Sequence, residues 1–247
     1  MKLLKLIKYL IILSIVLAII ISITPLKLYY SYIAKNIRPI KLEQMSGSVI
    51  KGSAEHVKYL GLDLGQANWM LYPSSYNEIT LDLKLKDELY DFNGKYKKTP
   101  SSDLLNDVYG TIDWALIDKF INFNHGEMSG YLKLDFSHIE FKNRVPERII
   151  GKIVTKELKL LKPIKKDLGE IEVVFVTDNP EIIVGQVNSR SNVINVSGSI
   201  YIHKNHKWEI KLTLLPMPGE YEIEYALQSI GDPRAGGGRS LNMAGFY

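Results

Sequence analysis

The histidines are the residues of this sequence best suited to metal binding or acid–base chemistry, and there are five: His56, His125, His138, His203 and His206. His203 and His206 lie three residues apart in a predicted hairpin end. Residues three apart on a strand point to opposite faces, so this pair is not expected to share a metal ion. His138 and Glu140 share a strand face, as many solvated pairs do. The chain has no cysteine, which excludes disulfides and Cys-based zinc sites.

Motifs for catalysis or nucleotide binding are also missing from the sequence. It contains neither H-E-x-x-H nor G-x-S-x-G. The glycine-rich stretch at residues 231–240, GDPRAGGGRS, lacks the Lys-Ser/Thr of a P-loop and is followed by no predicted helix. A flexible turn is the favoured interpretation. No nucleophile or acid–base pair stands out, so we predict a protein that is not an enzyme, with no catalytic residue, cofactor site or metal ligand.

Charge divides the sequence into two regions. Residues 1–42 carry seven basic and no acidic residues, whereas residues 43–247 carry 24 basic and 27 acidic ones. The net charge of +4 therefore comes from the N-terminal region, as expected beside anionic lipid headgroups. The remainder has no basic surplus for a phosphate backbone, so we expect no nucleic-acid partner.

The segment Tyr9–Leu26 contains 18 residues without a charge. At ~1.5 Å per residue a helix of this length spans about 27 Å, close to the thickness of a bilayer core. A cleaved signal peptide is the alternative, but its best cleavage site, Ser22-Ile23-Thr24, is followed directly by Pro25. We therefore predict an uncleaved signal anchor. Lys2, Lys5 and Lys8 on the short tail favour a cytoplasmic N-terminus.

The rest of the chain is predicted to be mainly β. Several segments alternate apolar and polar residues with a period of two, which indicates strands with one apolar face. Antiparallel sheets permit this pattern. The segments are ITLDLKL (79–85), YLKLDF (131–136), KWEIKLTLL (207–215) and EYEIEYAL (220–227).

Glycine recurs ahead of the short alternating runs, at Gly47, Gly94, Gly110, Gly130, Gly151, Gly169, Gly185, Gly198 and Gly245. Glycine at a strand entry permits turns, bulges and close backbone approach. These positions predict a meander of short antiparallel strands, in which Gly47 and Gly52 bracket the first strand and Trp69 packs over it.

A few helices are predicted between the strands. One begins at Ser101 or Ser102 and ends at Gly110. A second covers DWALIDKFINF (113–123), and a short third covers YALQSIG (225–231). The segment PERIIGKIVTKELKLLKP (146–163) is compatible with helix or strand, with strand favoured after Gly151.

Three motifs resemble the type II secretion system protein N family of Gram-negative bacteria. Residues 47–54, with Gly47 and Gly52, are similar to its G-T-hydrophobic-W-x-G-x-A motif, although the tryptophan is absent here. Residues 67–73, with Trp69 and Pro73, are similar to its hydrophobic-x-W-x-hydrophobic-x-P stretch. Residues 227–231, ending at Gly231, precede a glycine-rich turn and a last short strand that contains Gly245. Related patterns occur in the wider AsmA-like group.

The resemblance implies an accessory inner-membrane component of the type II secretion system, with partners among its inner-membrane and periplasmic subunits. The expected organisation is a cytoplasmic tail and single-pass anchor (residues 1–26), a juxtamembrane linker (27–42) and one periplasmic β-rich domain (43–247). Two alternatives remain open. A lipid-binding or lipid-transfer protein would leave the apolar sheet face open, whereas a scaffold would have it plugged. An envelope hydrolase would need a nucleophile and base that the sequence does not show.

Overall fold

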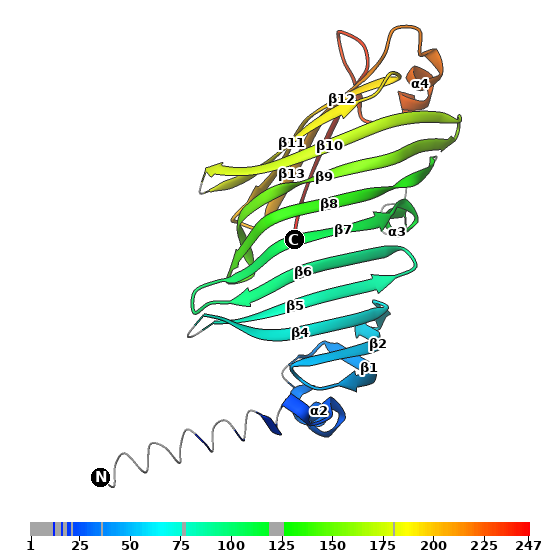
Figure 1. Ribbon diagram of the computed structural model, residues 1–247. Helices are drawn as coiled ribbons and strands as arrows, with labels where there is room; N and C mark the ends of the chain where they lie inside the picture. Colours follow the sequence, from blue (N-terminus) through cyan, green and yellow to red (C-terminus); the bar gives the residue numbers. More distant parts are fainter. Residues whose placement is uncertain are drawn as a thin grey trace. The chain divides into compact units, whose positions relative to one another are not determined.

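The computed structural model describes residues 12, 16, 19, 20, 22–35, 37–75, 78–118, 126–179 and 181–247 (Figure 1). Two compact units divide the chain, Met1–Glu88 and Leu89–Tyr247. Half of the predicted anchor, Tyr9–Leu26, lies outside the described residues. Where the structure does describe the chain, none of its helices has the length and apolar character needed to cross a membrane.

The first unit contains helix α2 and an antiparallel sheet with strand order β1-β2-β4-β5, in which the short β3 pairs with β2. Its elements are α2 (Leu26–Ile33), β1 (Ile40–Gly47), β2 (Lys51–Tyr59), β3 (Leu62–Asp63), β4 (Gln66–Ser75) and β5 (Glu78–Asp87). A small core forms where Ala54, Val57 and Ala67 are buried against larger neighbours that include Trp69 and Leu83.

The second unit is also antiparallel. Its strands from β6 to β13 each pair with their sequence neighbours, and β15 then pairs with β13 on one side and β14 on the other. The strands are β6 (Tyr90–Lys98), β7 (Asp103–Asp113), β8 (Glu127–Lys142), β9 (Val145–Lys162), β10 (Lys166–Asn179), β11 (Ile182–Arg190), β12 (Ile194–His203), β13 (Lys207–Pro216), β14 (Asp232–Pro233) and β15 (Arg239–Phe246). The helices among its described residues are α3 (Trp114–Asp118), α4 (Tyr221–Ala226) and the 3₁₀ turn η1 (Leu227–Ser229).

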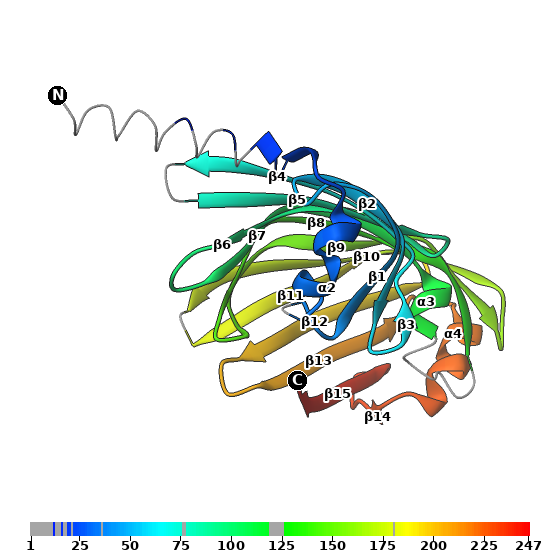
Figure 2. The same cartoon turned by 90° about the horizontal axis from the view of Figure 1, so that it is seen from below.

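The sheet of the second unit is twisted and curved, so the direction of its strands changes progressively from one strand to the next (Figure 2). The apolar residues of segments 131–136 and 207–215, among them Leu134, Phe136, Leu212 and Leu214, lie on one face of this sheet, which we call the inner face. At one place on it Phe136, Phe175 and Ile183 are buried together. At another, α4 and η1 cover it, and Ile223 and Leu227 pack against Val187, Val196 and Leu214.

The predicted mainly β fold, with antiparallel strands in meander order and few short helices, is confirmed. The helix predicted between Ser101 and Gly110 is wrong, because this segment forms most of β7. Strands β6 and β8 pair with it on both sides. The two ladders of backbone hydrogen bonds therefore outweigh the local capping signals.

The opposite error occurs at residues 220–227, which were predicted as a strand and form helix α4 over Tyr221–Ala226. Ile223 is 2 % exposed, whereas Tyr221 and Tyr225 are 77 % and 68 % exposed. A segment this short that buries one residue satisfies a helical period as well as a strand period.

Three further boundaries differ from the sequence prediction. The first strand ends at Gly47, so Gly47 and Gly52 bracket the turn between β1 and β2 and not the strand itself. The helix predicted from Asp113 is described only as α3, and its remaining residues, 119–123, lie outside the described part of the chain. The ambiguous segment 146–163 lies almost entirely in β9, including its residues before Gly151.

Candidate binding surface

The histidines that the structure describes make separate local contacts. His56 Nδ1 lies 2.8 Å from Asp63 Oδ2, and His138 Nδ1 lies 2.9 Å from Asn106 Oδ1. The His206 ring packs on Tyr247, with 5.2 Å between centroids. His125 lies outside the described residues. Within the described part of the chain, no group of three or more His, Asp or Glu side chains could hold a metal ion.

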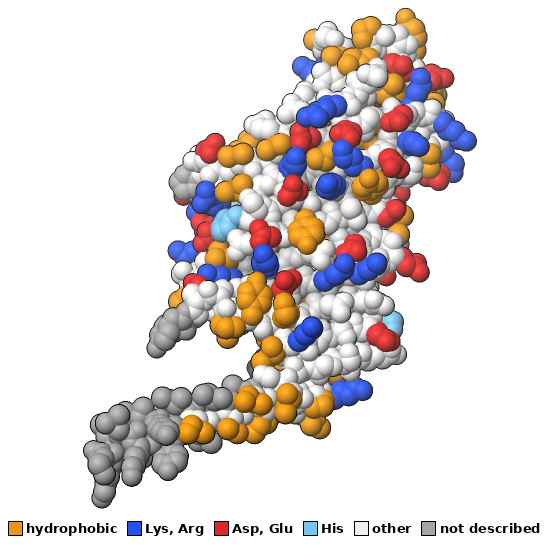
Figure 3. Space-filling view, in the orientation of Figure 1, with side chains coloured by type: hydrophobic (Ala, Val, Ile, Leu, Met, Phe, Trp, Pro, Cys, Tyr) orange, Lys and Arg blue, Asp and Glu red, His pale blue; other side chains and the backbone are white. Residues whose placement is uncertain are grey.

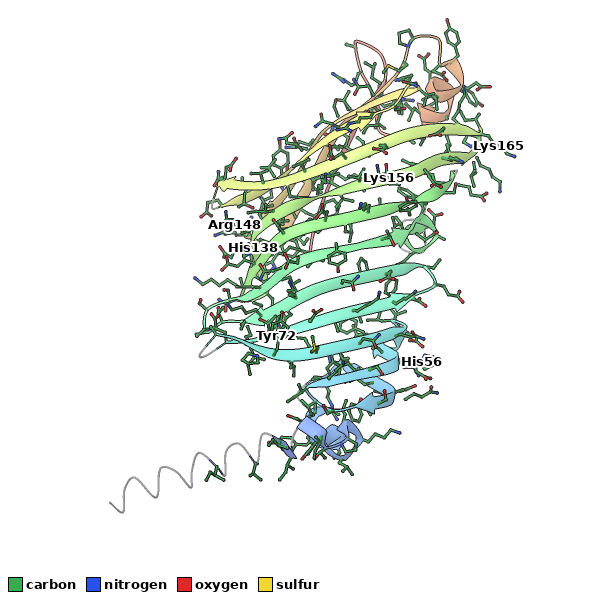
Figure 4. All side chains as sticks on the ribbon, viewed as in Figure 1. His56, Tyr72, His138, Arg148, Lys156 and Lys165 are labelled. Carbon is green, nitrogen blue, oxygen red and sulfur yellow. The ribbon has the colours of Figure 1, made fainter. Side chains whose placement is uncertain are left out.

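Figure 4 shows His138 on β8 and Arg148 on the adjacent strand β9. Arg148 lies opposite Glu140 in the β8–β9 ladder. His138 Nε2 is 3.9 Å from Glu140 Oε2, the pair that the sequence placed on one strand face. These are half-exposed contacts between neighbours on a sheet, and they bring together no nucleophile and base.

Five glycines each lie directly opposite an aromatic residue of the next strand. A Cβ atom built on any of them would lie 2.5–2.7 Å from an atom of the facing ring, closer than side chains pack. The ring covers the bare backbone, a known way of stabilising glycine in a sheet. The pairs are Gly52–Trp69, Gly110–Phe92, Gly151–Phe136, Gly185–Phe175 and Gly245–Trp208.

The predicted motif residues of the first unit meet around one of these pairs. Gly47 has φ +77° and lies opposite Gly52, which in turn lies opposite Trp69. The half-buried indole donates from Nε1 to the carbonyl oxygens of Ser48 and Val49, at 3.3 and 3.2 Å. A Cβ on Gly47 would lie 2.4 Å from the Lys51 carbonyl oxygen. Pro73 lies farther along β4, opposite Ile79.

The two motif glycines of the second unit, Gly231 and Gly245, lie at opposite ends of β15. Gly231, with φ +57°, approaches Ser240 so closely that an added Cβ would lie 2.2 Å from the Ser240 carbonyl oxygen. Gly245 lies beneath the Trp208 ring. Both glycines therefore have a structural role, because each allows a close approach that a side chain would prevent.

The inner face of the second unit is an extended apolar surface of the sheet. Beyond the part that α4 covers, its side chains are mostly half-buried, among them Leu105, Ile139 and Ile149. A hollow of about 450 Å³ is lined there by Tyr96, Asp103, Leu105, Phe141 and Arg144. Such a surface can bind an apolar group or another protein segment.

Polar groups line one side of this hollow. Tyr96 Oη donates a hydrogen bond of 2.7 Å to Asp103 Oδ1. Burial, together with this bond, raises the pKa of Tyr96 to about 12. The same hydrogen bond lowers the pKa of Asp103. At neutral pH the pair is therefore a neutral phenol bound to a carboxylate.

The opposite, outer face carries charges of both signs. Glu209 Oε1 accepts from Lys207 Nζ at 2.6 Å, and its Oε2 lies 2.8 Å from Lys211 Nζ. These two hydrogen bonds lower the pKa of Glu209 to about 2. Figure 3 shows acidic and basic side chains interspersed over the second unit on the face that it presents. This mixture is typical of a solvated surface.

The fold and its surfaces thus define a β-rich protein whose most developed feature is an apolar sheet face built on glycine–aromatic pairs. A family model described as type II secretion system (T2SS), protein N matches residues 38–242. The chain belongs to this family, which confirms the resemblance seen in its motifs. Membership makes it an accessory component of the type II secretion system. No curated protein and no solved structure matches the chain.

Sequence reasoning placed Trp69 over the strand bracketed by Gly47 and Gly52, close to the observed Gly52–Trp69 pair, and missed the other four pairs. Part of the signal was visible, because four of the five glycines, Gly110, Gly151, Gly185 and Gly245, precede short alternating runs. Identifying the partner requires the strand register, which short-range patterns leave undetermined. The hollow was missed for the same reason, because its residues come from β6, β7, β8 and the following turn.

Proposed function

We propose that this protein is an inner-membrane accessory component of the type II secretion system that binds other subunits in the periplasm through its β-rich part. The observation that carries the proposal is the family match over residues 38–242. The charge-free segment Tyr9–Leu26 and the basic residues that flank it support a single-pass anchor.

The proposed organisation is a tail and anchor over residues 1–26, a juxtamembrane segment over 27–42 and a periplasmic β-rich part over 43–247. Helix α2, apart from its first residue Leu26, and the start of β1 fall within the juxtamembrane segment. The proposed docking surface is the inner face around the hollow. Leu105 and Phe141 are half-buried there, and this surface is apolar, whereas the outer face is charged.

A second candidate function is lipid binding. The specific observation in its favour is the part of the inner face that α4 leaves uncovered, since acyl chains need an open apolar surface. The covered end, where Ile223 and Leu227 are buried, favours a plugged scaffold. The two functions predict different phenotypes.

Deletion of the gene tests the proposed function. We expect export of type II substrates to fall, while growth and the lipid composition of the outer membrane stay unchanged. A chain truncated to residues 1–42 should behave like the deletion, since it lacks the β-rich part. Normal export with an altered lipid distribution would favour the lipid-binding function and contradict ours.

Complementation with point variants locates the surface. Leu105→Glu places a charge on the inner face, and Tyr109→Glu places one on the same strand at an outer position that is 55 % exposed. We expect the first variant to fail in restoring export and the second to succeed, with both present at wild-type levels. Equal restoration would show that the inner face around Leu105 is not the docking surface.

The contribution of the membrane anchor to export can be measured separately. An engineered protease site between α2 and β1 would release the β-rich part from the membrane. Export should then weaken, because an anchored domain has a higher effective concentration near membrane partners. Unchanged export after complete cleavage would contradict a role for the anchor.

A further inference from the structure

Strand β15 lies at the end of the sheet of the second unit, where the short β14 covers only a small part of its length (Figure 2). It pairs with β13 from Arg239 to Phe246. On its other side, β14 pairs only with Arg239 and Ser240. Among the described residues, no strand pairs with 241–246 on that side.

The direction of the unpaired backbone groups follows from the ladder. Tyr247 N–H donates to the His206 carbonyl oxygen, across to the β13 side, at 3.0 Å. In an antiparallel pair, alternate residues direct both backbone groups to the same neighbour. Met243 and Gly245 therefore bond to β13, whereas Asn242, Ala244 and Phe246 direct their N–H and C=O groups away from the sheet.

This edge lacks the features that usually prevent strand pairing. Residues 240–247, SLNMAGFY, contain no charge and no proline. Met243 is 47 % exposed and Phe246 is 78 % exposed. Natural edge strands are commonly protected by charges, proline, bulges or a covering element. An apolar, uncharged edge of this kind is a template for another strand.

The edge strand of the first unit, β1, is protected in these ways. Leu42 N–H donates to Tyr30 Oη of α2 at 2.7 Å. Gln44 has φ +52°, which interrupts the regular strand, and Lys41 and Glu43 add charge. The chain thus shields one edge and leaves the other available.

We propose that β15 pairs antiparallel with β15 of a second copy of this chain, with the two Ala244 residues opposite each other. Asn242 then lies opposite Phe246 of the second copy. In this register each of the three outward-directed positions, Asn242, Ala244 and Phe246, lies opposite an outward-directed position of the second copy. A shift of two residues toward β14 would instead use Ser240, which β14 already covers.

The chemistry of the edge favours a second copy as the occupant. Because the segment is uncharged, self-pairing brings no like charges together. Met243 would lie opposite Gly245 of the second copy, a large side chain beside a bare backbone. Exposed apolar surface of Met243 and Phe246 would also be covered. One pair of strands is smaller than a standard protein interface, so a weak and reversible dimer is expected.

Single-cysteine crosslinking tests the register, because the natural chain has no cysteine. The full chain carrying Ala244→Cys is produced in its host at native level, and membranes are treated with a mild oxidant. Paired Cα atoms in the proposed register lie about 5.5 Å apart, within disulfide range. A band at twice the chain mass is expected on a non-reducing gel.

Asn242→Cys is the matched control, since it lies on the same strand face and is also exposed. Its two copies would lie four residues apart, roughly 13 Å at 3.3 Å per residue, so crosslinking should fall about tenfold or more. Cells that produce both Asn242→Cys and Phe246→Cys chains should regain the dimer. Absence of the Ala244→Cys dimer, equal crosslinking of both variants, or a disulfide to a different protein would overturn the proposal.

A proline variant provides an independent measurement. Ala244 N–H is not used by the β13 ladder, and proline is tolerated on an edge strand where N–H faces solvent. Ala244→Pro should reduce co-isolation of two differently tagged copies several-fold, whereas Ala244→Ser should not. Wild-type co-isolation by the Ala244→Pro chain at normal abundance would contradict strand pairing at this edge.

Discussion

At the scale of single residues, the glycines of this protein are explained by the rings that face them. A glycine in a strand interior is unfavourable, since it has no side chain to pack and loses much conformational freedom. Here the side chain comes from the opposite strand. Phe136 and Phe175, which cover Gly151 and Gly185, also contact each other, with centroids 6.0 Å apart. The pairs therefore form part of a continuous apolar layer.

Trp69 gives the first prediction. Trp69→Ala removes a half-buried ring and leaves Gly52 uncovered, so we expect a loss of about 2–3 kcal/mol, below the ~3–5 kcal/mol typical of fully buried tryptophan. Trp69→Phe keeps a ring but loses the hydrogen bonds from Nε1 and should cost about 1 kcal/mol. Urea denaturation of the purified full chain measures both. A loss under ~1 kcal/mol for Trp69→Ala would contradict packing at this pair.

Gly185 gives the second prediction. An added Cβ would lie 2.7 Å from the Phe175 ring, and Phe175 is only 7 % exposed. The ring has little room to move, so Gly185→Ala should cost about 1–3 kcal/mol, as overpacked cores do.

Gly236→Ala is its control, because nothing lies within 4 Å of a Cβ at that position. It should be neutral or stabilise slightly, by less than about 1 kcal/mol. Thermal unfolding of the two variants side by side checks this difference. Equal melting temperatures would show that Phe175 adapts freely.

At the scale of elements, α4 is the helix that completes the core of the second unit. It is only six residues long, too short to be stable alone. Its stability comes from burying Ile223 against the inner face. An ion pair adds a second attachment, since Lys166 Nζ lies 2.9 Å from Glu220 Oε2. The hydrogen bonds that Lys166 donates to Glu220 and Glu222 raise the pKa of Lys166, which keeps it charged at neutral pH.

Ile223 gives the third prediction. Ile223→Ala should cost about 2–5 kcal/mol, because it leaves a cavity between α4 and the sheet. Tyr225→Ala, on the exposed side of the same helix, should change stability by less than about 0.5 kcal/mol. Amide hydrogen exchange would locate the effect. Faster exchange in β12 and β13 is expected for Ile223→Ala alone, and its absence would show that α4 does not hold this part of the sheet.

At the scale of the whole molecule, function depends on where the chain is located. The proposed anchor would hold the β-rich part beside membrane partners. A short basic tail and an uncharged segment of bilayer length favour insertion with the C-terminal part outside the cytoplasm.

The fourth prediction tests this topology. Alkaline phosphatase fused after Tyr247 should be active, since it folds only outside the cytoplasm, and a fluorescent protein that folds only inside should be dark at the same position. The chain should also keep its full mass in membranes. An inactive phosphatase fusion, or a soluble product that begins near Pro25, would contradict the signal anchor.

The sequence by itself determined the fold class, the family and much of the strand content. Period-two alternation in 79–85, 131–136 and 207–215 predicted strands that the structure contains. These patterns are reliable because each long strand buries one face, and burial of one face imposes alternation on the residues themselves. The motif residues around Gly52 and Trp69 are also local patterns, so the sequence alone was enough to show the family resemblance.

Tertiary structure decided what local patterns leave open. Residues 103–113 became a strand because two neighbours supplied hydrogen bonds, and residues 221–226 became a helix because one face of α4 fits a core that exists only after the sheet forms. Register also paired Phe92, Phe136, Phe175 and Trp208 with their glycines, which lie 18, 15, 10 and 37 residues away in sequence. Which residues meet across strands depends on the folded chain as a whole, because pairing energy is realised only once the strands are aligned.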